Sequence, residues 1–371
     1  MIETAHLRSR RGQENAHTEA DVIRGAPMEI RLYKEEDRER WDRYVFQANT
    51  ATCYHASGWK KIIEDSFGHK TYYLLAENEQ HEMQGILPLV HLKSILFGNF
   101  MVSLPYVNYG GICADSREIE QQLFGAAVAL ASRKQAVHME LRHQADLCCG
   151  LPVKTNKVSM TLELRPRPGE LWESFSAKLR NQIQRPMREL MHARLGAEEE
   201  LDGFYSVFSQ NMRDLGTPVY SKEFFQNILR GFPGSTKICT VYTAGGQPVA
   251  AGVLVGFKGR LEIPWASSIR TYNRHSPNML LYWSALKYGC EQGYRVFDFG
   301  RSTRGEGTYK FKEQWGAKPV QLYWHYWIKD GGTLPELNPK NPKYRLAINI
   351  WKRLPLALTK FIGPALVKNL P

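Results

Sequence analysis

A strand-like run that follows a helix-like segment constrains the fold of this chain more than any other feature. Residues 296–299 alternate as a buried strand does, and Asp298 is the polar member of the run. A helix-like segment at 277–292 precedes the run, and an aromatic strand at 321–328 follows it. This order predicts an α/β chain in which helices pack on a sheet.

A glycine and several cations come after this strand. Gly300 and Arg301 stand where a strand opens into a cleft. Lys310 and Lys312 share one face if their segment is extended, with Phe311 on the other face. Cations gathered past a strand end predict an anion-binding site. A solvated basic loop is the alternative, although the Gly, Trp and Phe content argues against a plain surface loop.

The length and charge of the chain limit its class. It has 371 residues, which suggests two or three domains, and 43% of them are hydrophobic, which suffices for two cores. The formal net charge of +12 suits an anionic partner such as tRNA, a nucleotide, a lipid-linked pyrophosphate or a membrane surface.

The cysteine pattern predicts no metal site. None of the six cysteines forms a spaced ligand set with nearby histidines. Cys148 and Cys149 are adjacent and cannot bridge each other without strain, so we expect a reducing cytoplasm. The N-terminus lacks the apolar core of a signal peptide, and no apolar run reaches the roughly 18 residues of a spanning helix.

Four stretches carry a resemblance to a known family. They are residues 103–111, 211–220, 278–283 and 297–317. From about residue 28 to its C-terminus the chain resembles the FemAB-related proteins associated with the PEP-CTERM/exosortase system. Those proteins belong with the Fem aminoacyltransferases in the GNAT-like acyltransferase superfamily.

The resemblance, together with the order of the elements, implies an α/β (α+β) fold with two tandem GNAT-like units. Each unit is expected to be a mixed twisted sheet flanked by helices. We expect a disordered tail at 1–27, a first unit at 28–158, and a second unit at 159–330 that carries the acyl-transfer cleft. Residues 331–371 are expected to form a basic amphipathic segment.

The C-terminal segment and Pro186 each lead to a further prediction. From Lys340 onward the chain has cations and apolar residues but no Asp or Glu, which suits either a membrane interface or docking on the first domain. Pro186 lies inside the helix that begins at Pro168, where we expect it to kink or restart that helix.

The resemblance implies that two neighbouring parallel strands, 260–266 and 295–299, part to hold the donor. Pro264 cannot donate to a sheet ladder, so within a sheet it marks an edge, a bulge or a splay, and it falls where the resemblance implies a bulge. Glu262 and Asp298 lie on these strands and are candidates for the general base. For Asp298, a structural pair with Arg301 is the alternative.

The donor's phosphates are expected at the helix that follows the first of these strands. Pro277 suits the first helical position and Ser276 its cap, and backbone N–H groups there can take a phosphate, with Arg274 and Asn278 beside them. A helix cap without a ligand is the alternative. The glycine-rich signature of acetyl-CoA users is absent, which favours aminoacyl-tRNA or another activated acyl carrier.

The acceptor residues are carried over from the resemblance. Lys312 matches the Phe-Lys pair of the Fem relatives and is a catalytic candidate. Arg180 and Asn181 match a basic helix that faces the same cleft. Arg213 and Asp214 either shape the acceptor cleft or pair with each other. The other substrate-binding candidates are Tyr220, Arg301, Ser302, Lys310, Phe311 and Trp315.

The resemblance implies an N-acyltransferase or aminoacyltransferase that acts on a cell-envelope or exopolysaccharide precursor, with an amino sugar or a lipid-linked molecule as acceptor. It is expected to work at the inner face of the cytoplasmic membrane, with acyl-CoA or aminoacyl-tRNA as donor and no permanently bound cofactor. An inactive glycolipid-binding assembly factor and an RNA-binding module are the alternatives.

Overall fold

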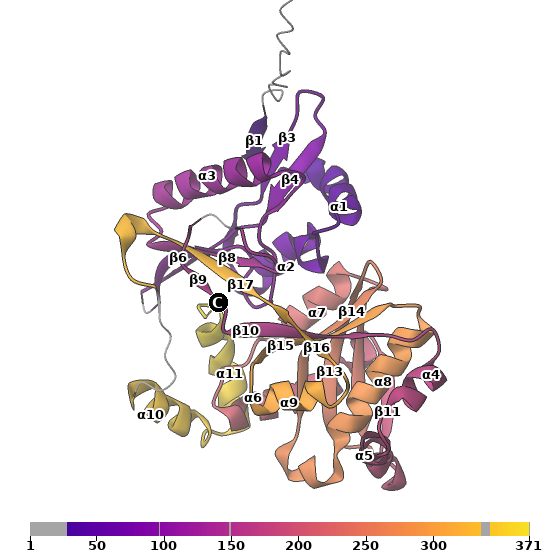
Figure 1. Ribbon diagram of the computed structural model, residues 1–371. Helices are drawn as coiled ribbons and strands as arrows, with labels where there is room; N and C mark the ends of the chain where they lie inside the picture. Colours follow the sequence, from indigo (N-terminus) through magenta and orange to yellow (C-terminus); the bar gives the residue numbers. More distant parts are fainter. Residues whose placement is uncertain (1–27, 96, 148–149, 335–341, 371) are drawn as a thin grey trace, which may run out of the picture.

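The computed structural model describes residues 28–95, 97–147, 150–334 and 342–370. The expected tail, 1–27, and the Cys148–Cys149 pair lie outside these residues. Figure 1 shows two lobes, with the first unit above and the second unit below.

The first unit contains two sheets. Its elements are β1 (Glu29–Leu32), η1 (Glu35–Asp37), α1 (Arg38–Gln47), η2 (Cys53–His55), α2 (Gly58–Phe67), β2 (Lys70–Thr71), β3 (Leu74–Glu77), β4 (Met83–Leu87), β5 (Val90–Ser94), β6 (Gly98–Val102), β7 (Cys113–Ala114), α3 (Arg117–Arg133), β8 (His138–His143) and β9 (Val153–Lys154). One sheet has the strand order β1-β3-β4-β7, and the other has the order β2-β5-β6-β8-β17-β9.

Helix α3 shows how the sequence sets these elements. The Ser116 hydroxyl accepts a hydrogen bond from the Ile119 N–H and so caps the helix. Ile119, Leu123 and Ala127 recur at four-residue spacing and are buried in one cluster with Leu74 of β3. The helix therefore covers one face of the sheet that contains β3 and β4.

The second unit contains one seven-stranded sheet with the order β11-β12-β13-β14-β15-β10-β16. Its elements are β10 (Lys157–Glu163), α4 (Pro168–Ser174), α5 (Ala177–Arg188), β11 (His192–Gly196), η3 (Glu198–Glu200), α6 (Leu201–Leu215), α7 (Lys222–Gly231), β12 (Thr236–Tyr242), β13 (Pro248–Phe257), β14 (Arg260–Ser268), η4 (Arg270–His275), α8 (Pro277–Glu291), β15 (Val296–Thr303), α9 (Gly307–Glu313) and β16 (Lys318–Gln321). This is the mixed α/β architecture that the sequence predicted.

The two units share a hydrophobic core. Phe67 of α2 lies against Phe224 of α7, with ring centroids 4.9 Å apart, and Trp265 of β14 belongs to the same cluster. Because interiors pack at close to crystal density, this shared core fixes how the units sit against each other.

The chain returns to the first unit after β16. Strand β17 (Tyr323–Ile328) pairs antiparallel with β8 and β9 of the first unit, whereas β16 pairs with β10 in the seven-stranded sheet of the second unit. The single strand expected at 321–328 is therefore divided at Leu322 between two sheets. The expected domain boundary at residue 330 does not follow the sheets, because β17 belongs to the first unit. The short helix η5 (Lys329–Gly331) follows β17.

The long helix expected from Pro168 onward is two helices. Phe175 and Ser176 separate them, and the Ser176 hydroxyl accepts the Leu179 N–H to cap α5. Helix α5 runs through Pro186 and ends at Arg188, so the helix does not restart at the proline. Pro186 stands in the last turn of the helix.

The C-terminal segment docks on both units. Its helices are α10 (Pro342–Trp351) and α11 (Leu356–Val367). The Lys368 carbonyl accepts hydrogen bonds from the Tyr106 hydroxyl at 2.5 Å and from His69 Nε2 at 2.6 Å in the first unit. In the second unit, Lys360 lies over the Tyr205 ring of α6. Among the described residues, none of the helices is both long and apolar enough to span a lipid bilayer.

Candidate active site

Strands β14 and β15 part immediately after two carboxylates. They run parallel and pair Arg260 with Val296, Leu261 with Phe297 and Glu262 with Asp298, where the register ends. β14 continues to Ser268 and β15 continues to Thr303. The opening expected between these strands is therefore present, and its closed end is the Glu262–Asp298 pair.

The expected irregularity at Pro264 is also present. β13 pairs Val253 with Trp265 and Val255 with Glu262. Two steps along β13 therefore face three along β14, which is a β-bulge. Because Pro264 has no N–H to donate, it is tolerated at this break in the ladder.

Asp298 is a buried carboxylate with a full set of donors. Ser159 Oγ donates to its Oδ1 at 2.5 Å, and the Gly300 N–H donates to the same oxygen at 2.8 Å. Its Oδ2 accepts from the Tyr109 hydroxyl at 2.5 Å and from the Arg260 guanidinium at 3.1 Å. The arginine that pairs with Asp298 is thus Arg260, and the Arg301 pairing considered from the sequence is wrong.

Glu262 lies beside Asp298 and is held differently. The Asn108 amide donates to its Oε1 at 3.1 Å, and the side chain is fully buried. Burial, and secondly the negative charge of Asp298, raise the pKa of Glu262 to about 8. A carboxylate with this pKa holds a proton at neutral pH and accepts one readily at slightly higher pH.

Lys312 lies on helix α9, so the extended segment expected for residues 310–312 is wrong. Its Nζ donates to the Gly300 carbonyl at 2.9 Å and to the Arg301 carbonyl at 3.0 Å, whereas Lys310 is exposed. Burial lowers the pKa of Lys312 to about 8. Gly300 has φ +74°, a conformation that favours glycine, and Lys312 fixes this turn directly after Asp298.

Arg301 faces the first unit. Its guanidinium lies over the Trp324 ring at 4.9 Å, and that of Arg142 lies over the same ring at 4.4 Å. Arg142 is neutralised by Glu140, which it contacts at 2.6 Å. Ser302 is buried, and its hydroxyl has no hydrogen-bond partner among the described residues.

Other predicted acceptor residues have structural contacts. Arg213 Nε donates to Asp214 Oδ1 at 2.7 Å, which is the pairing considered for them from the sequence. Tyr220 packs against Tyr106, with ring centroids 5.7 Å apart. Trp315 is buried in the core of the second unit, and Phe311 packs partly buried against that core.

The predicted donor residues lie beside α5. Ser276 has φ +59° and makes no side-chain cap, so the expected capping bond is absent from the described contacts. Arg274 Nε donates to His275 Nε2 at 2.8 Å, and Asn278 stands in the first turn of α8. His275 also pairs with Glu189, directly after α5.

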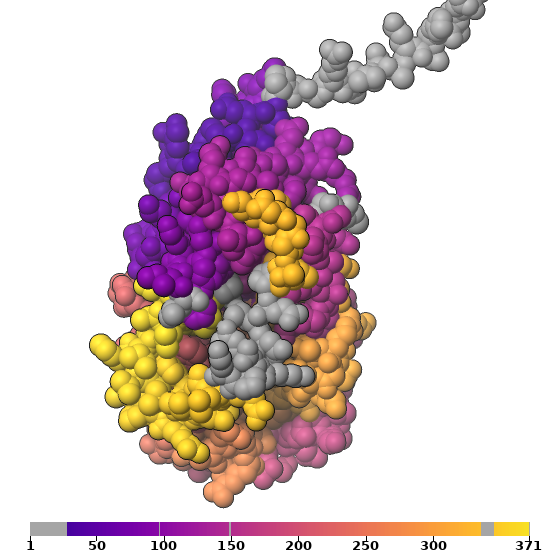
Figure 2. Space-filling model, turned by 90° about the vertical axis from the view of Figure 1, so that its left-hand side faces the viewer, coloured from indigo at the N-terminus to yellow at the C-terminus, as the bar shows by residue number. Residues whose placement is uncertain are grey.

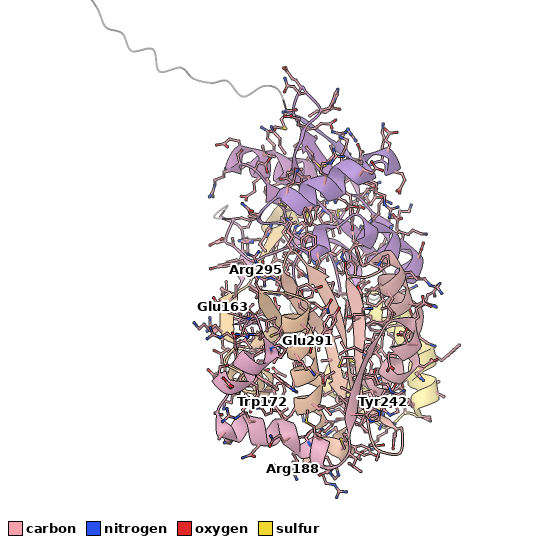
Figure 3. The ribbon with its side chains drawn as sticks, turned by 90° about the vertical axis from the view of Figure 1, so that its right-hand side faces the viewer. Glu163, Trp172, Arg188, Tyr242, Glu291 and Arg295 are labelled. Atoms are coloured by element: carbon pink, nitrogen blue, oxygen red, sulfur yellow. The ribbon has the colours of Figure 1, made fainter. Side chains whose placement is uncertain are left out.

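Arg180 and Asn181 lie in the N-terminal half of α5, at the other end of this helix from Glu189, and Arg180 donates to the Glu173 carbonyl at 3.4 Å. Both lie on α5, which packs against α8. Figure 3 places α5, marked by Arg188, at the far end of the second unit from Arg295.

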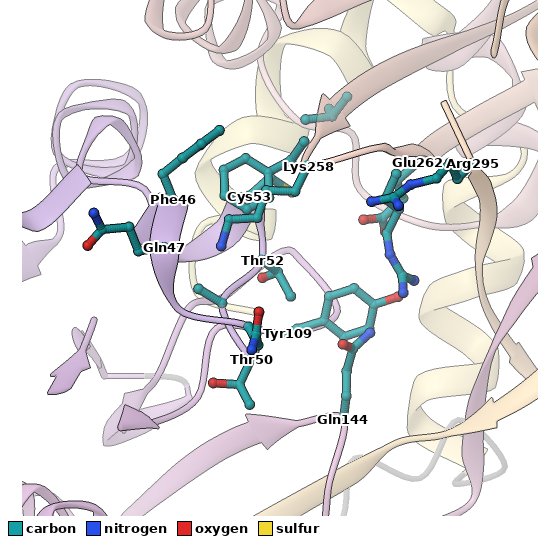
Figure 4. A pocket seen from close by; sticks show the side chains of 15 residues that line it. Phe46, Gln47, Thr50, Thr52, Cys53, Tyr109, Gln144, Lys258, Glu262 and Arg295 are labelled. Carbon is teal, nitrogen blue, oxygen red and sulfur yellow. The ribbon is translucent and has the colours of Figure 1, made fainter. Parts of the chain in front are cut away.

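A cavity of about 360 Å³ lies between the units next to the carboxylate pair. Figure 4 shows its lining. The first unit contributes Phe46, Gln47, Asn49, Thr50, Ala51, Thr52, Cys53, Tyr109 and Gln144, and the second contributes Val255, Phe257, Lys258, Arg260, Glu262 and Arg295.

Sequence reasoning did not select the cations of this cavity. Lys258 and Arg260 flank the turn before β14, and Arg295 directly precedes β15. Their clustering at the start of two neighbouring parallel strands was the available signal. Tyr109 was in a stretch that carried the resemblance, but its bond to Asp298 was not foreseen.

Comparison with known proteins defines the class of this fold. The sequence matches the family described as Acetyltransferase (GNAT) domain over residues 177–313. No curated protein matches it. The structure is similar to the crystal structure of FemX, with 13% identity, a TM-score of 0.62, and coverage of 86% of this chain and 100% of that chain.

Two further structures are similar over most of the chain. L-PGS from Bacillus licheniformis is 12% identical, with a TM-score of 0.54 and coverage of 86% of this chain and 98% of that chain. A tandem GNAT protein from the clavulanic acid biosynthesis pathway is 11% identical, with a TM-score of 0.51 and coverage of 83% and 100%. The protein therefore has a Fem-like fold of two tandem GNAT-like units, and the match to the GNAT domain family lies within the second unit.

Proposed function

We propose that the protein transfers an acyl or aminoacyl group to an amine at the point where β14 and β15 part. The observation that carries this proposal is the Glu262–Asp298 pair at the closed end of the opening. An acyl group held in the opening and an amine beside Glu262 would be within reach of each other. Holding two reactants in this way supplies a large part of catalysis in acyl transfer.

Glu262 is the proposed base. In its ionised form it takes a proton from the attacking ammonium, and the amine nitrogen then bonds to the acyl carbon while the carrier leaves. Asp298 is fixed beside Glu262 by Arg260, Tyr109 and Ser159, and its charge helps to raise the pKa of Glu262. Beyond Glu262 the edge of β14 that faces β15 has no ladder partner among the described strands, which leaves peptide N–H groups to stabilise an oxyanion.

The donor is proposed to be acyl-CoA or aminoacyl-tRNA. The GNAT domain match supports a CoA ester. The missing glycine-rich signature before α8 supports another carrier. In either case the N-terminus of α8, beginning at Pro277, is the proposed phosphate site, because its first backbone N–H groups point along the helix axis toward an anion.

The acceptor is proposed to be an amino sugar or lipid-linked precursor of the cell envelope or of an exopolysaccharide. The resemblance to proteins of the PEP-CTERM/exosortase system supports this setting. The fold of L-PGS and of a putative lysylphosphatidylglycerol synthetase domain from Agrobacterium fabrum supports it by analogy only, since a shared fold does not fix a substrate.

We also propose that α10 and α11 rest on an anionic membrane surface. Leu346, Ile350 and Phe361 are 63%, 53% and 81% exposed, and Figure 2 shows these helices in yellow on an open face of the molecule. Residues 340–371 contain cations but no Asp or Glu. Exposed apolar side chains among cations are typical of interfacial helices.

One observation favours the alternative of an inactive glycolipid-binding assembly factor. Asp298 and Lys312 are both fully engaged in hydrogen bonds within the protein. This arrangement also serves a rigid binding scaffold.

A transfer assay separates these functions. Purified protein is incubated with labelled acyl-CoA or aminoacyl-tRNA and with amino sugars, and the product is followed by mass spectrometry. Glu262→Gln should lower the rate by about 100-fold or more, as expected for loss of a general base. Glu291→Gln, an exposed change on α8, is the matched control and should leave the rate unchanged. An undiminished rate in Glu262→Gln would exclude Glu262 as the base.

A further inference from the structure

The cavity beside Glu262 is strongly cationic. Lys258, Arg260 and Arg295 line it, and Glu262 is the acidic side chain among its lining residues. Because Glu262 holds a proton at neutral pH and Arg260 is paired with Asp298, the unbalanced charges of the lining are those of Lys258 and Arg295.

Two of these cations have no acidic partner. Among the described residues, neither Lys258 nor Arg295 has a carboxylate within 4.0 Å. Lys258 Nζ instead donates to the Ala48 carbonyl at 2.7 Å and lies over the Phe257 ring at 5.2 Å. Lys258 is partly buried, and desolvation lowers its pKa, whereas Arg295 is exposed. An anionic ligand would offset the cost of desolvation at Lys258 and pair with the guanidinium of Arg295.

The third cation links the cavity to the carboxylate pair. Arg260 and Glu262 are two residues apart on β14, so their side chains leave the same face of the strand. Their Cα atoms are separated by about 7 Å at strand spacing. One small molecule can therefore place an anionic group near Arg260 and an amine near Glu262 at the same time.

We propose that this cavity binds an anionic group of the acceptor, so that the acceptor is a small amine carrying a phosphate or a carboxylate. This inference rests on the proposed function, because it takes Glu262 to face the amine. The volume of about 360 Å³ is within the range of small-molecule sites and accommodates a molecule the size of a charged amino sugar. Lys258 and Arg295 would bind the anion, and Thr50, Thr52 and Gln144 provide polar groups on the opposite wall.

Equilibrium binding without a donor tests this inference. The full-length protein is titrated by calorimetry with glucosamine 6-phosphate, with glucosaminic acid and with glucosamine, which has no anionic group. The first two probes separate a phosphate ligand from a carboxylate ligand. At least one of them should bind 10-fold or more tightly than glucosamine, with an affinity that falls as salt increases, as expected for charge-assisted hydrogen bonds.

Variants locate the binding. Arg295→Gln and Lys258→Gln should each weaken the binding of the preferred probe by about 10-fold. Arg188→Gln is the matched control, because Arg188 lies at the far end of the second unit (Figure 3) and should leave binding unchanged. Thermal melting of each variant checks its fold, and the wild-type preference for a probe with an anionic group remains decisive if a variant fails to fold.

The results have separate meanings. Equal binding of all three probes, or binding that survives both substitutions in folded protein, would overturn the cavity assignment. Because no donor is present, Arg295-dependent binding of a probe with an anionic group supports the cavity even if no acyl transfer is detected. Acyl transfer without binding of such a probe in the cavity would agree with the proposed function but would show that the cavity is not the site of the acceptor's anionic group.

Discussion

Replacing Glu262 by glutamine should make the protein more stable at alkaline pH. The pKa of this buried acid is raised from 4.5 to about 8 in the folded protein, while in the unfolded chain it is ordinary. Between these values the folded state binds more protons than the unfolded state, so wild-type stability falls as pH rises. The difference corresponds to roughly 5 kcal/mol once the pH exceeds 8, since each pH unit is worth about 1.4 kcal/mol.

Urea unfolding of wild type and Glu262→Gln at intervals from pH 4.5 to 9 measures this effect. The free-energy difference between the two proteins should move in favour of the variant through this window and level off above pH 8. Asp298→Asn should shrink the pH-dependent part, because the charge of Asp298 helps to raise the pKa of Glu262. A difference that stays constant with pH would refute a buried, protonated Glu262.

Other substitutions test the neighbouring structure. Lys312→Met should lower the free energy of unfolding by about 1–3 kcal/mol, because the buried Gly300 carbonyl and the partly buried Arg301 carbonyl lose their donor. Chemical denaturation measures this change, and Lys310→Met, at an exposed site, is the control. Ile350→Asp with Phe361→Asp should reduce co-sedimentation with vesicles containing anionic lipid while the melting temperature stays near that of wild type. Equal binding by the variant and wild type would remove α10 and α11 as the membrane contact.

Local patterns predicted most of the second unit. The segments around 260–266 and 296–299 became β14 and β15 because their alternation matches a pleated strand. The missing N–H of Pro264 predicted an edge, a bulge or a splay, and the resemblance favoured the bulge that the structure has. The closeness of Glu262 and Asp298 followed from the resemblance, which gave the parallel pairing that the residues themselves do not specify.

Long-range contacts explain what the sequence did not predict. β17 joins the six-stranded sheet of the first unit, where six of its residues pair with β8. The sequence of β17 does not indicate which strand it pairs with. The segment around Lys312 is a helix of seven residues, which is too short for hydrophobic periodicity to distinguish a helix from a strand. The buried Lys312 donates to the carbonyl of Gly300, which lies outside this helix. The cationic cavity required the loop near Thr52 to meet the starts of β14 and β15 from another unit.

The pH–rate profile of acyl transfer tests the central claim most directly. If Glu262 beside Asp298 is the base at the parted strands, kcat/KM should rise with pH to a plateau with a midpoint near 8, and Asp298→Asn should move that midpoint to lower pH. A rate that is independent of pH between 6 and 9, or a midpoint unchanged by Asp298→Asn, would contradict the account.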